Sequence, residues 1–288
     1  MKISDAFDEF RKNEILALGR SNNTNEGYIY AEKKVIGFFG DINIENIDID
    51  GVHGFYLAMI INLSKNTARQ YICQLRTVLS YCKKRGIKTM NPDDIRTPNR
   101  EKKVARFITC EEFNVFIREM NRSHHGYSNL NRFRNTLIAN LLFVTGLRVS
   151  ELCALNRDSI HDRQFSVVGK SKDPRPCYIT KEVERDIEHY LAMRHDSNKA
   201  LFVANQNGRR ITPKNVQRIF RRVSVDSGIF SVTPHTLRHS YATRLIEDGV
   251  DIRYVATLLG HQSLETTQKY THVRDNRLRK VYENVMEK

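Results

Sequence analysis

The sequence predicts a mostly helical protein of two domains, the second of which carries a small antiparallel sheet. Three observations predict this class. Apolar residues recur at intervals of three and four over most of the 288 residues, they alternate only around 163–180, and they lose their periodicity at 86–107. This last stretch contains two prolines and ends in a basic run, which is typical of a linker. We expect a helical domain at 1–97, a linker at 98–106 and a larger domain at 107–288.

Three segments of the first domain have helical spacing. Residues 3–18 and 22–39 show it, and residues 64–86 form the clearest helix, with an apolar stripe of Tyr71, Ile72, Leu75, Val78, Leu79 and Cys82. The cations of that helix lie largely off the stripe and are Lys65, Arg69, Arg76, Lys83 and Lys84. They form either a solvated face or a face that contacts phosphates, and the sequence favours both equally.

The second domain begins with a capping box, in which Thr109 and Glu112 start a helix. A further helix over 132–146 ends at Gly146, because glycine adopts the left-handed conformation that stops a helix. The alternating stretch predicts two short strands joined by a charged turn, and everything after Thr180 is again helical in pattern.

Charge points to a polyanionic partner. The formal net charge is +14 and the pI is near 9.6. Residues 1–100 hold 15 Lys and Arg against 12 Asp and Glu, whereas the rest of the chain holds 32 against 21. An excess of this size favours binding to nucleic acid, although a basic protein that is merely soluble has the same composition.

Cysteine usage and the absence of apolar runs indicate the compartment. The chain lacks any Cys-x-x-Cys pair, and we expect reduced core thiols, as in a cytosolic protein, at Cys73, Cys82, Cys110, Cys153 and Cys177. The N-terminus is acidic where a signal peptide is apolar, and no run of about 18 apolar residues occurs. We therefore expect a protein that stays inside the cell and has no membrane partner.

A helix that begins at "TPHTLRHS" raises an electrostatic question. Thr233 is placed as the N-cap and Pro234 as the first helical residue, so the positive end of the helix dipole lies here. Cations nevertheless crowd the first turns, with His235 and Arg238 three residues apart on one face. We expect His239 to point elsewhere, as an ordinary core histidine. The pattern predicts that an anion binds at this helix end.

Further cations stand in unusual settings. Arg148 follows a glycine turn, between two apolar residues, where a structural salt bridge with Glu151 is the alternative interpretation. Lys170 and Lys172 occupy the hairpin tip, which in isolation is only a polar turn. His261 follows Gly260 at a helix end, and Tyr270 comes nine residues later. No one of these residues is diagnostic alone.

Together these side chains favour phosphoryl transfer. Two guanidinium groups from separate segments bind two non-bridging oxygens of a phosphodiester, which supplies the missing anion. Two arginines, a lysine, two histidines and a hydroxyl nucleophile suffice without metal, whereas two-metal nucleases need clustered carboxylates, and no stretch groups Asp and Glu among these residues. We expect no metal and no cofactor. The lack of a Walker-type glycine loop predicts independence from ATP as well.

At these residues the sequence resembles the tyrosine recombinases, the phage-integrase family. "TGLRVSEL" at 145–152, the hairpin lysine and "HTLRHSYATRLIEDGVDIRYVATLLGHQSLETTQKYTHV" at 235–273 match the sequence boxes of the family in order and spacing. The first hundred residues resemble its helical, SAM-like core-binding domain, and the length is most similar to that of the Xer recombinases. The resemblance implies a DNA breaking and rejoining fold.

The resemblance also implies a role for each candidate residue. Tyr270 matches the nucleophile that forms a 3′-phosphotyrosine, and Arg148 and Arg238 match the pair that stabilises the transition state. His235 matches the histidine that helps to move the tyrosine proton, and His261 a donor to the phosphate. Lys170 matches the general acid. The family often shows Gly-Lys-Gly-x-Lys, whereas Ser171 and Lys172 follow here, so Lys172 remains an alternative.

The function that this resemblance implies is site-specific recombination through a Holliday junction, in chromosome dimer resolution or in the integration and excision of a mobile element. The implied partner is double-stranded DNA with short inverted-repeat half-sites, bound by a homotetramer or heterotetramer on two sites at the nucleoid. Candidate DNA contacts are Lys65, Arg69, Arg76 and Lys172. The alternatives are a type IB topoisomerase and a catalytically silent DNA-binding protein.

A C-terminal tail helix completes the expectation. Its apolar face is formed by Leu278, Val281, Val285 and Met286. This face packs either on its own domain or on a neighbouring protomer, and the sequence leaves both open.

Overall fold

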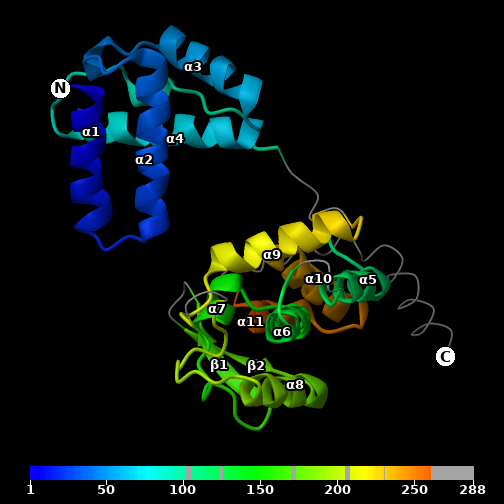
Figure 1. Ribbon diagram of the computed structural model, residues 1–288. Coiled ribbons are helices and arrows are strands. Elements are labelled where there is room, and N and C mark those ends of the chain that lie inside the picture. The colour runs from blue at the N-terminus through cyan, green and yellow to red at the C-terminus, as the bar shows by residue number, and fades with distance from the viewer. Residues whose placement is uncertain (102–105, 123–125, 170–172, 205–207, 230, 261–288) are drawn as a thin grey trace. The chain divides into compact units, whose positions relative to one another are not determined.

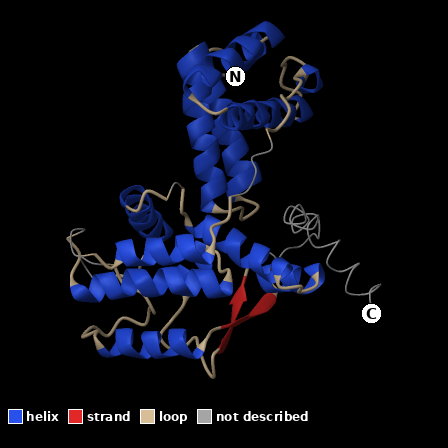
Figure 2. Ribbon diagram, turned by 90° about the vertical axis from the view of Figure 1, so that its right-hand side faces the viewer, coloured by secondary structure: helices blue, strands red, loops and turns tan. Residues whose placement is uncertain are grey.

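The chain folds into two compact units, residues 1–103 and 104–288, in a computed structural model (Figure 1). The structure describes residues 1–101, 106–122, 126–169, 173–204, 208–229 and 231–260. Helices make up most of the described residues of both units, and the described part of the second unit contains one antiparallel pair of strands (Figure 2). The predicted fold class is therefore confirmed. The boundary between the units falls inside the stretch that was predicted as the linker.

The first unit is a bundle of four helices with short extra turns. Its elements are α1 (Ile3–Phe10), the π-helical turn η1 (Arg11–Leu16), α2 (Asn22–Phe39), the 3₁₀ turn η2 (Ile44–Asn46), α3 (Ile49–Asn62), α4 (Lys65–Lys84) and the 3₁₀ turn η3 (Pro92–Asp94). Serine caps start two of these helices. Ser21 and Ser64 each accept a hydrogen bond from the backbone N–H three residues later, which satisfies a donor that the helix leaves free.

Helix α4 forms the centre of the first core. Of its predicted apolar stripe, all members but Tyr71 are buried, and Tyr71 packs partly buried against the same cluster. The segment that follows α4 belongs to this unit as well, because Ile95 is buried and the Arg76 Nε donates to the Pro92 carbonyl at 3.0 Å. Residues 86–97 lack helical periodicity, but contacts with α4 hold part of this segment against the first unit, so it is not a free linker.

The second unit is helical around one hairpin. Its described elements are α5 (Cys110–Met120), α6 (Asn129–Thr145), α7 (Val149–Ala154), β1 (Gln164–Val168), β2 (Pro174–Tyr178), α8 (Lys181–Ala192), α9 (Pro213–Asp226), α10 (Pro234–Glu247) and α11 (Ile252–Leu259). In the hairpin register, Phe165 pairs with Cys177 and Val167 with Arg175. All four of these side chains are buried, so the hairpin presents one face to the core.

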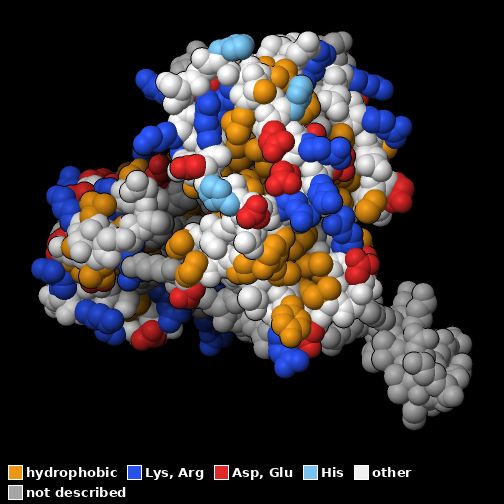
Figure 3. Space-filling view, turned by 90° about the horizontal axis from the view of Figure 1, so that it is seen from below, with side chains coloured by type: hydrophobic (Ala, Val, Ile, Leu, Met, Phe, Trp, Pro, Cys, Tyr) orange, Lys and Arg blue, Asp and Glu red, His pale blue; other side chains and the backbone are white. Residues whose placement is uncertain are grey.

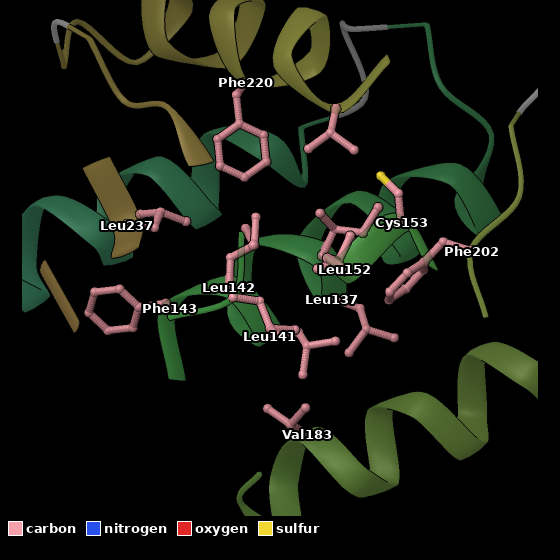
Figure 4. Packing of buried hydrophobic residues seen from close by; sticks show 14 of the residues in the cluster. Leu137, Leu141, Leu142, Phe143, Leu152, Cys153, Val183, Phe202, Phe220 and Leu237 are labelled. Carbon is pink, nitrogen blue, oxygen red and sulfur yellow. The ribbon is translucent and has the colours of Figure 1, made fainter. Parts of the chain in front are cut away.

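The core of this unit lies around α6. Leu141 and Leu142 are fully buried, and Figure 4 shows them among side chains from α9 and α10, including Phe220 and Leu237. The predicted helix ends are confirmed. Thr109 and Glu112 form the capping box of α5, Thr233 caps α10, and Gly146 ends α6 with φ +62°.

The prediction of continuous helix after Thr180 is wrong for the described residues between α8 and α9. These residues form a connection with two isolated bridges, Asn156 to Ala200 and Val203 to Arg210. Buried arginines, in place of a helix, satisfy its carbonyl groups. Arg194 Nη1 donates to the Ala200 and Leu201 carbonyls at 2.7 and 2.9 Å.

All five cysteines are free thiols, as expected, but they are not all in the core. Cys82, Cys153 and Cys177 are buried, and burial raises the pKa of Cys153 to about 12. Cys73 is half-buried, whereas Cys110 is exposed because it lies on the outer face of the first turn of α5. None of the described helices is both long enough and apolar enough to cross a membrane.

Candidate functional site

Two predicted arginines meet at the C-terminal end of α11. Arg148 lies at the start of α7, and its Nη2 donates to the Gly260 carbonyl at 3.3 Å. Arg238 lies on α10, and its Nη2 donates to the Leu259 carbonyl, one residue earlier. The two guanidinium groups come from segments 90 residues apart in the sequence and bond to adjacent carbonyls. This is the pairing that the sequence predicted for a phosphate clamp.

Arg148 owes its position to a capping box. It is the N-cap of α7 in an extended conformation, and its backbone N–H donates to Glu151 Oε2 at 2.8 Å while its Nη1 donates to Oε1 at 2.7 Å. The salt bridge that was the alternative interpretation is therefore present. It does not use up the guanidinium, which has five N–H groups and whose side chain remains 30% exposed. Structural pairing and anion binding are compatible in this geometry.

Arg238 is held more deeply. The residue is 4% exposed, and its Nη1 donates to the Gly146 carbonyl at 2.7 Å. Its two carbonyl bonds thus connect the end of α6 with the end of α11. Gly146 is required here, because a Cβ at this position would overlap the ring of Tyr241 and because its φ is +62°. The arginine is fixed before any ligand arrives, which is the condition for electrostatic preorganisation.

His235 lies near both arginines. Desolvation by the surrounding protein, followed by the positive charges of Arg238 and Arg148, lowers the pKa of His235, although the residue as a whole is exposed. The expectation that His239 points elsewhere is wrong. Nε2 of His239 and Nε2 of His235 are 2.9 Å apart, and the rings meet edge to face. Residues four apart lie on the same face of a helix as surely as residues three apart do.

Glu151 and Arg175 lie beside Arg148, and these three residues with Arg238 and His235 form what we call the arginine cluster. Sequence reasoning did not assign Arg175 to it. Arg175 Nη2 donates to Glu151 Oε2 at 2.5 Å, and both side chains are buried. A signal existed, because alternation from the buried Cys177 places Arg175 on the inward face of β2. A charged residue at an inward strand position needs a buried partner.

Four predicted residues lie outside the described part of the chain: Lys170, Lys172, His261 and Tyr270. Two of them directly follow glycines that touch the cluster. A Cβ on Gly169 would stand 3.1 Å from Arg148 Nη1, and a Cβ on Gly260 would stand 2.7 Å from Arg175 Cδ. The backbone thus reaches the arginines at the residues before Lys170 and His261. The tail helix also lies outside the described residues.

Two other tyrosines are alternatives for the nucleophile. Tyr241 packs against Gly146, and burial raises the pKa of its hydroxyl. Tyr254 is 68% exposed on α11. Burial and a raised pKa make Tyr241 a poor nucleophile.

The candidate DNA contacts of α4 are engaged within the first unit. Lys65 Nζ lies 3.1 Å from Glu101, Arg69 Nε donates to the Pro98 carbonyl at 2.8 Å, and Arg76 Nη2 pairs with Asp93 at 3.1 Å. An open hollow on this unit is nevertheless lined by four cations, Arg20, Arg69, Arg76 and Lys84, and by two carboxylates, Glu14 and Asp93. The contacts of Lys65, Arg69 and Arg76 hold the segment after α4. Neither the solvated-face nor the phosphate-contact interpretation of these cations predicted this role.

A second basic surface lies on α9. Lys214, Arg218 and Arg221 are exposed at helical spacing, and no acidic partner of theirs occurs within the described ranges. On the face shown in Figure 3, Lys and Arg side chains gather in small groups between apolar and acidic ones. The positive charge on this face is therefore divided among separate groups of side chains.

The described ranges contain no group of three or more His, Cys, Asp or Glu side chains suited to a metal ion.

Comparisons with known proteins show what the chain is similar to. The profile of the phage integrase family matches residues 106–277. The chain is 34% identical over 255 residues to tyrosine recombinase XerD of Oceanobacillus iheyensis, which covers 84% of this chain and 82% of that protein. It is 32% identical over 272 residues to tyrosine recombinase XerA of Thermococcus kodakarensis, which covers 92% of this chain and 90% of that protein.

Solved structures share the fold. An integrase of the transposon Tn1549 in complex with circular intermediate DNA matches with a TM-score of 0.76 at 18% identity, over 94% of this chain and 95% of that one. The XerH site-specific recombinase in a post-cleavage complex with palindromic difH matches with a TM-score of 0.74 at 22% identity, over 99% and 84%. A lambda integrase dimer on a COC′ core site matches with a TM-score of 0.75 at 20% identity, over 96% and 78%.

Proposed function

The chain belongs to the phage integrase family of tyrosine recombinases, enzymes that cut and rejoin DNA strands at specific sites, and we propose that it does so without a metal ion or ATP. The observation that carries this proposal is the meeting of Arg148 and Arg238 at the end of α11. Two preformed guanidinium groups suit the two non-bridging oxygens of one phosphodiester.

In the proposed first step, the Tyr270 hydroxyl oxygen attacks the DNA phosphorus. The new P–O bond forms as the P–O5′ bond breaks, which gives a 3′-phosphotyrosine and a free 5′-hydroxyl. The tyrosine proton leaves toward His235, whose lowered pKa keeps its ring neutral and able to accept it. Lys170 gives a proton to the departing 5′-oxygen, with Lys172 as the alternative acid. Rejoining reverses these steps with a 5′-hydroxyl from the partner strand.

The charge of the transition state is balanced by side chains in this proposal. Arg148 and Arg238 contact the non-bridging oxygens, and His261 donates a further hydrogen bond. Glu151, a buried carboxylate of the cluster, already accepts from two arginines and is therefore committed to them. The phosphotyrosine bond conserves the free energy of the phosphodiester, so that religation requires no ATP.

DNA binding in this proposal uses both units. The exposed stripe of Lys214, Arg218 and Arg221 on α9 is suited to DNA phosphates or base edges, and the hollow beside α4 adds cations from the core-binding unit. Inverted-repeat half-sites would each bind one protomer, and two sites would join a tetramer, homomeric or heteromeric. The substrate implies action at the nucleoid, in the cytoplasm.

Trapping on a nicked suicide substrate tests the proposal. The substrate carries the site recovered from DNA that is covalently bound to the protein in cells. We expect a covalent adduct with wild-type protein, unchanged in EDTA, and none with Tyr270→Phe, which binds DNA normally because only a hydroxyl is lost. Ionic strength is held constant, since DNA binding weakens steeply with salt.

The outcomes separate the alternatives. An adduct that forms with Tyr270→Phe would move the nucleophile to Tyr254 or Tyr241, and cleavage that EDTA abolishes and magnesium restores would refute the metal-free mechanism. Strand exchange between two sites then distinguishes a recombinase from a topoisomerase, which would trap without exchanging. A catalytically silent DNA-binding protein would do neither.

A further inference from the structure

One buried carboxylate is shared by two arginines in the second unit. Glu151 Oε1 accepts from Arg148 Nη1 at 2.7 Å, while Oε2 accepts from the Arg148 backbone N–H at 2.8 Å and from Arg175 Nη2 at 2.5 Å. The side chains of Glu151 and Arg175 are 6% and 5% exposed, whereas that of Arg148 is 30% exposed. The exposed guanidinium is thus backed by a buried ion pair.

The charge count of this cluster favours a bound anion. Two guanidinium groups face one carboxylate, so the three side chains carry a net charge of +1, and the outermost group is Arg148. Without Arg175, Glu151 would present a full buried negative charge to Arg148 alone. Its two oxygens match the guanidinium fork, and the resulting bidentate pair would cancel the positive charge offered to a phosphate.

Arg175 also supports the backbone that holds Arg148. Its Cδ and Nε occupy the space beside Gly260, where a Cβ would approach to 2.7 and 2.9 Å, and the Gly260 carbonyl accepts from Arg148 Nη2. Its Nη1 donates to Sγ of Cys177, on the same face of β2, at 2.9 Å. Arg175 therefore touches the two groups that orient Arg148, the Glu151 carboxylate and the end of α11.

We propose that Arg175 is a positioning residue for DNA cleavage, which keeps Arg148 available to the scissile phosphate by sharing the charge of Glu151. This inference rests on the proposed function. In this inference Arg175 does not touch the phosphate itself, because its side chain is only 5% exposed whereas that of Arg148 is 30% exposed. Its loss acts on the transition state through the charge and the orientation of Arg148.

Rates of adduct formation on the suicide substrate test the inference. Arg175→Met should fold and bind DNA, but cleave about 10- to 100-fold more slowly, somewhat less than the loss of a donor that touches the oxyanion. Glu151→Gln in the Arg175→Met background removes the unbalanced carboxylate charge, and the double variant should cleave faster than Arg175→Met. A purely structural role for Arg175 predicts no such rescue, because the second substitution removes a further buried contact.

Arg194→Met is the matched control. Arg194 is another buried arginine of the second unit that pairs with a carboxylate, Asp196, and it is not part of the arginine cluster. The Arg194→Met substitution should lower the melting temperature, while the cleavage rate of the folded variant stays within twofold of the wild-type rate.

The outcomes are decisive in both directions. Arg175→Met within twofold of the wild-type rate, or a double variant no faster than Arg175→Met, overturns the inference. If methionine prevents folding, Arg175→Lys and Arg175→Gln replace it. Arg175→Lys keeps a positive charge beside Glu151, so it should cleave DNA faster than Arg175→Gln. Equal cleavage rates of these two variants would overturn the inference. A wild-type protein that forms no adduct refutes the proposed function instead.

Discussion

Two groups of arginines in the second unit differ in how much of the side chain remains exposed after internal bonding. Around the connection between α8 and α9, Arg194 is fully buried and bonded to Asp196 and to backbone carbonyls. In the arginine cluster, Arg148 bonds to Glu151 and to one carbonyl and keeps 30% of its side chain exposed. Both arginines make an ion pair. What separates a structural arginine from a ligand-binding one is the solvent-facing donors that remain after internal bonding.

Arg238 lies between these two types. It is as buried as the structural arginines and bonds to two carbonyls, yet it lies on the helix that carries His235 and meets the same end of α11 as Arg148. Its burial gives the site rigidity, and its neighbour Arg148 gives the site access to solvent. In the proposed phosphate clamp, the deep arginine makes one side preorganised and the shallow arginine leaves the other side open.

The largest expected effect separates the two types of arginine. Arg148→Met should slow adduct formation by about 10²- to 10³-fold, because a preorganised cation is lost from the transition state. It should lower the free energy of unfolding by only about 1–2 kcal/mol, because the buried Glu151 loses one donor but keeps Arg175 as a partner. Arg194→Met should instead lower the free energy of unfolding by about 3 kcal/mol, since the carbonyls that it serves become unsatisfied. Urea unfolding and cleavage kinetics on both variants measure this contrast. Equal stability losses in the two would break it.

Arg238→Met should combine both effects. We expect a loss of cleavage similar to that of Arg148→Met, together with a destabilisation of about 2–4 kcal/mol, since the ends of α6 and α11 lose their shared donor. The same two measurements apply. A variant of normal stability would mean that Arg238 is as dispensable to the fold as Arg148.

Two glycines of positive φ sharpen the comparison on the backbone. Gly260→Ala should destabilise by about 2–4 kcal/mol, because φ is +62° and the new Cβ meets Arg175 at 2.7 Å. Gly208→Ala, with φ +59° and nothing within 4 Å of the Cβ, should cost only about 1–2 kcal/mol for the backbone strain. Thermal unfolding of the pair isolates the contribution of Arg175. Similar losses of stability in Gly260→Ala and Gly208→Ala would mean that the Arg175 side chain moves away from the new Cβ at no energetic cost.

The smallest effect concerns His235. Its pKa in the DNA-free protein should lie below the ordinary value of 6.5, because desolvation and then the charges of Arg238 and Arg148 disfavour the protonated ring. The folded state therefore binds fewer protons than the unfolded state at acid pH, so this group lowers stability as pH falls below 6.5 and has no effect well above it. NMR titration of the ring should show the pKa rise toward the ordinary value in Arg148→Met. An unchanged pKa in that variant would exclude Arg148 as a cause.

Local sequence signals predicted much of the fold. The stripe of α4, the capping box at Thr109, the N-cap at Thr233 and the glycine end of α6 depend on residues within one or two helical turns, and all four are confirmed. The connection between α8 and α9 was missed because its carbonyls bond to arginine side chains from α6 and from the residues flanking it, as with Arg134 and Val203. Periodicity records nothing of such donors.

For the candidate site, the sequence supplied the residue types, and a family resemblance supplied their roles. The sequence could not show that Arg148 pairs with Glu151 and still remains exposed. A salt bridge and anion binding were treated as alternatives, whereas the structure is compatible with both. Sequence reasoning also separated His239 from His235, although the two rings are in contact. The pairing of Arg69 and Arg76 with the segment after α4 was likewise invisible, because it joins α4 to a stretch without periodicity.

By itself, the sequence determined the helical class, the helix ends and the set of cations that suits a phosphodiester, because these depend on spacing and side-chain chemistry along the chain. Only the tertiary structure decided that Arg175 joins the cluster, since its partners Glu151 and Gly260 lie 24 and 85 residues away and meet it through the packing of β2 against α7 and α11. The physical reason is that burial and charge balance depend on distance in space. A hydrogen bond of 2.5 Å between residues far apart in sequence leaves no periodic trace.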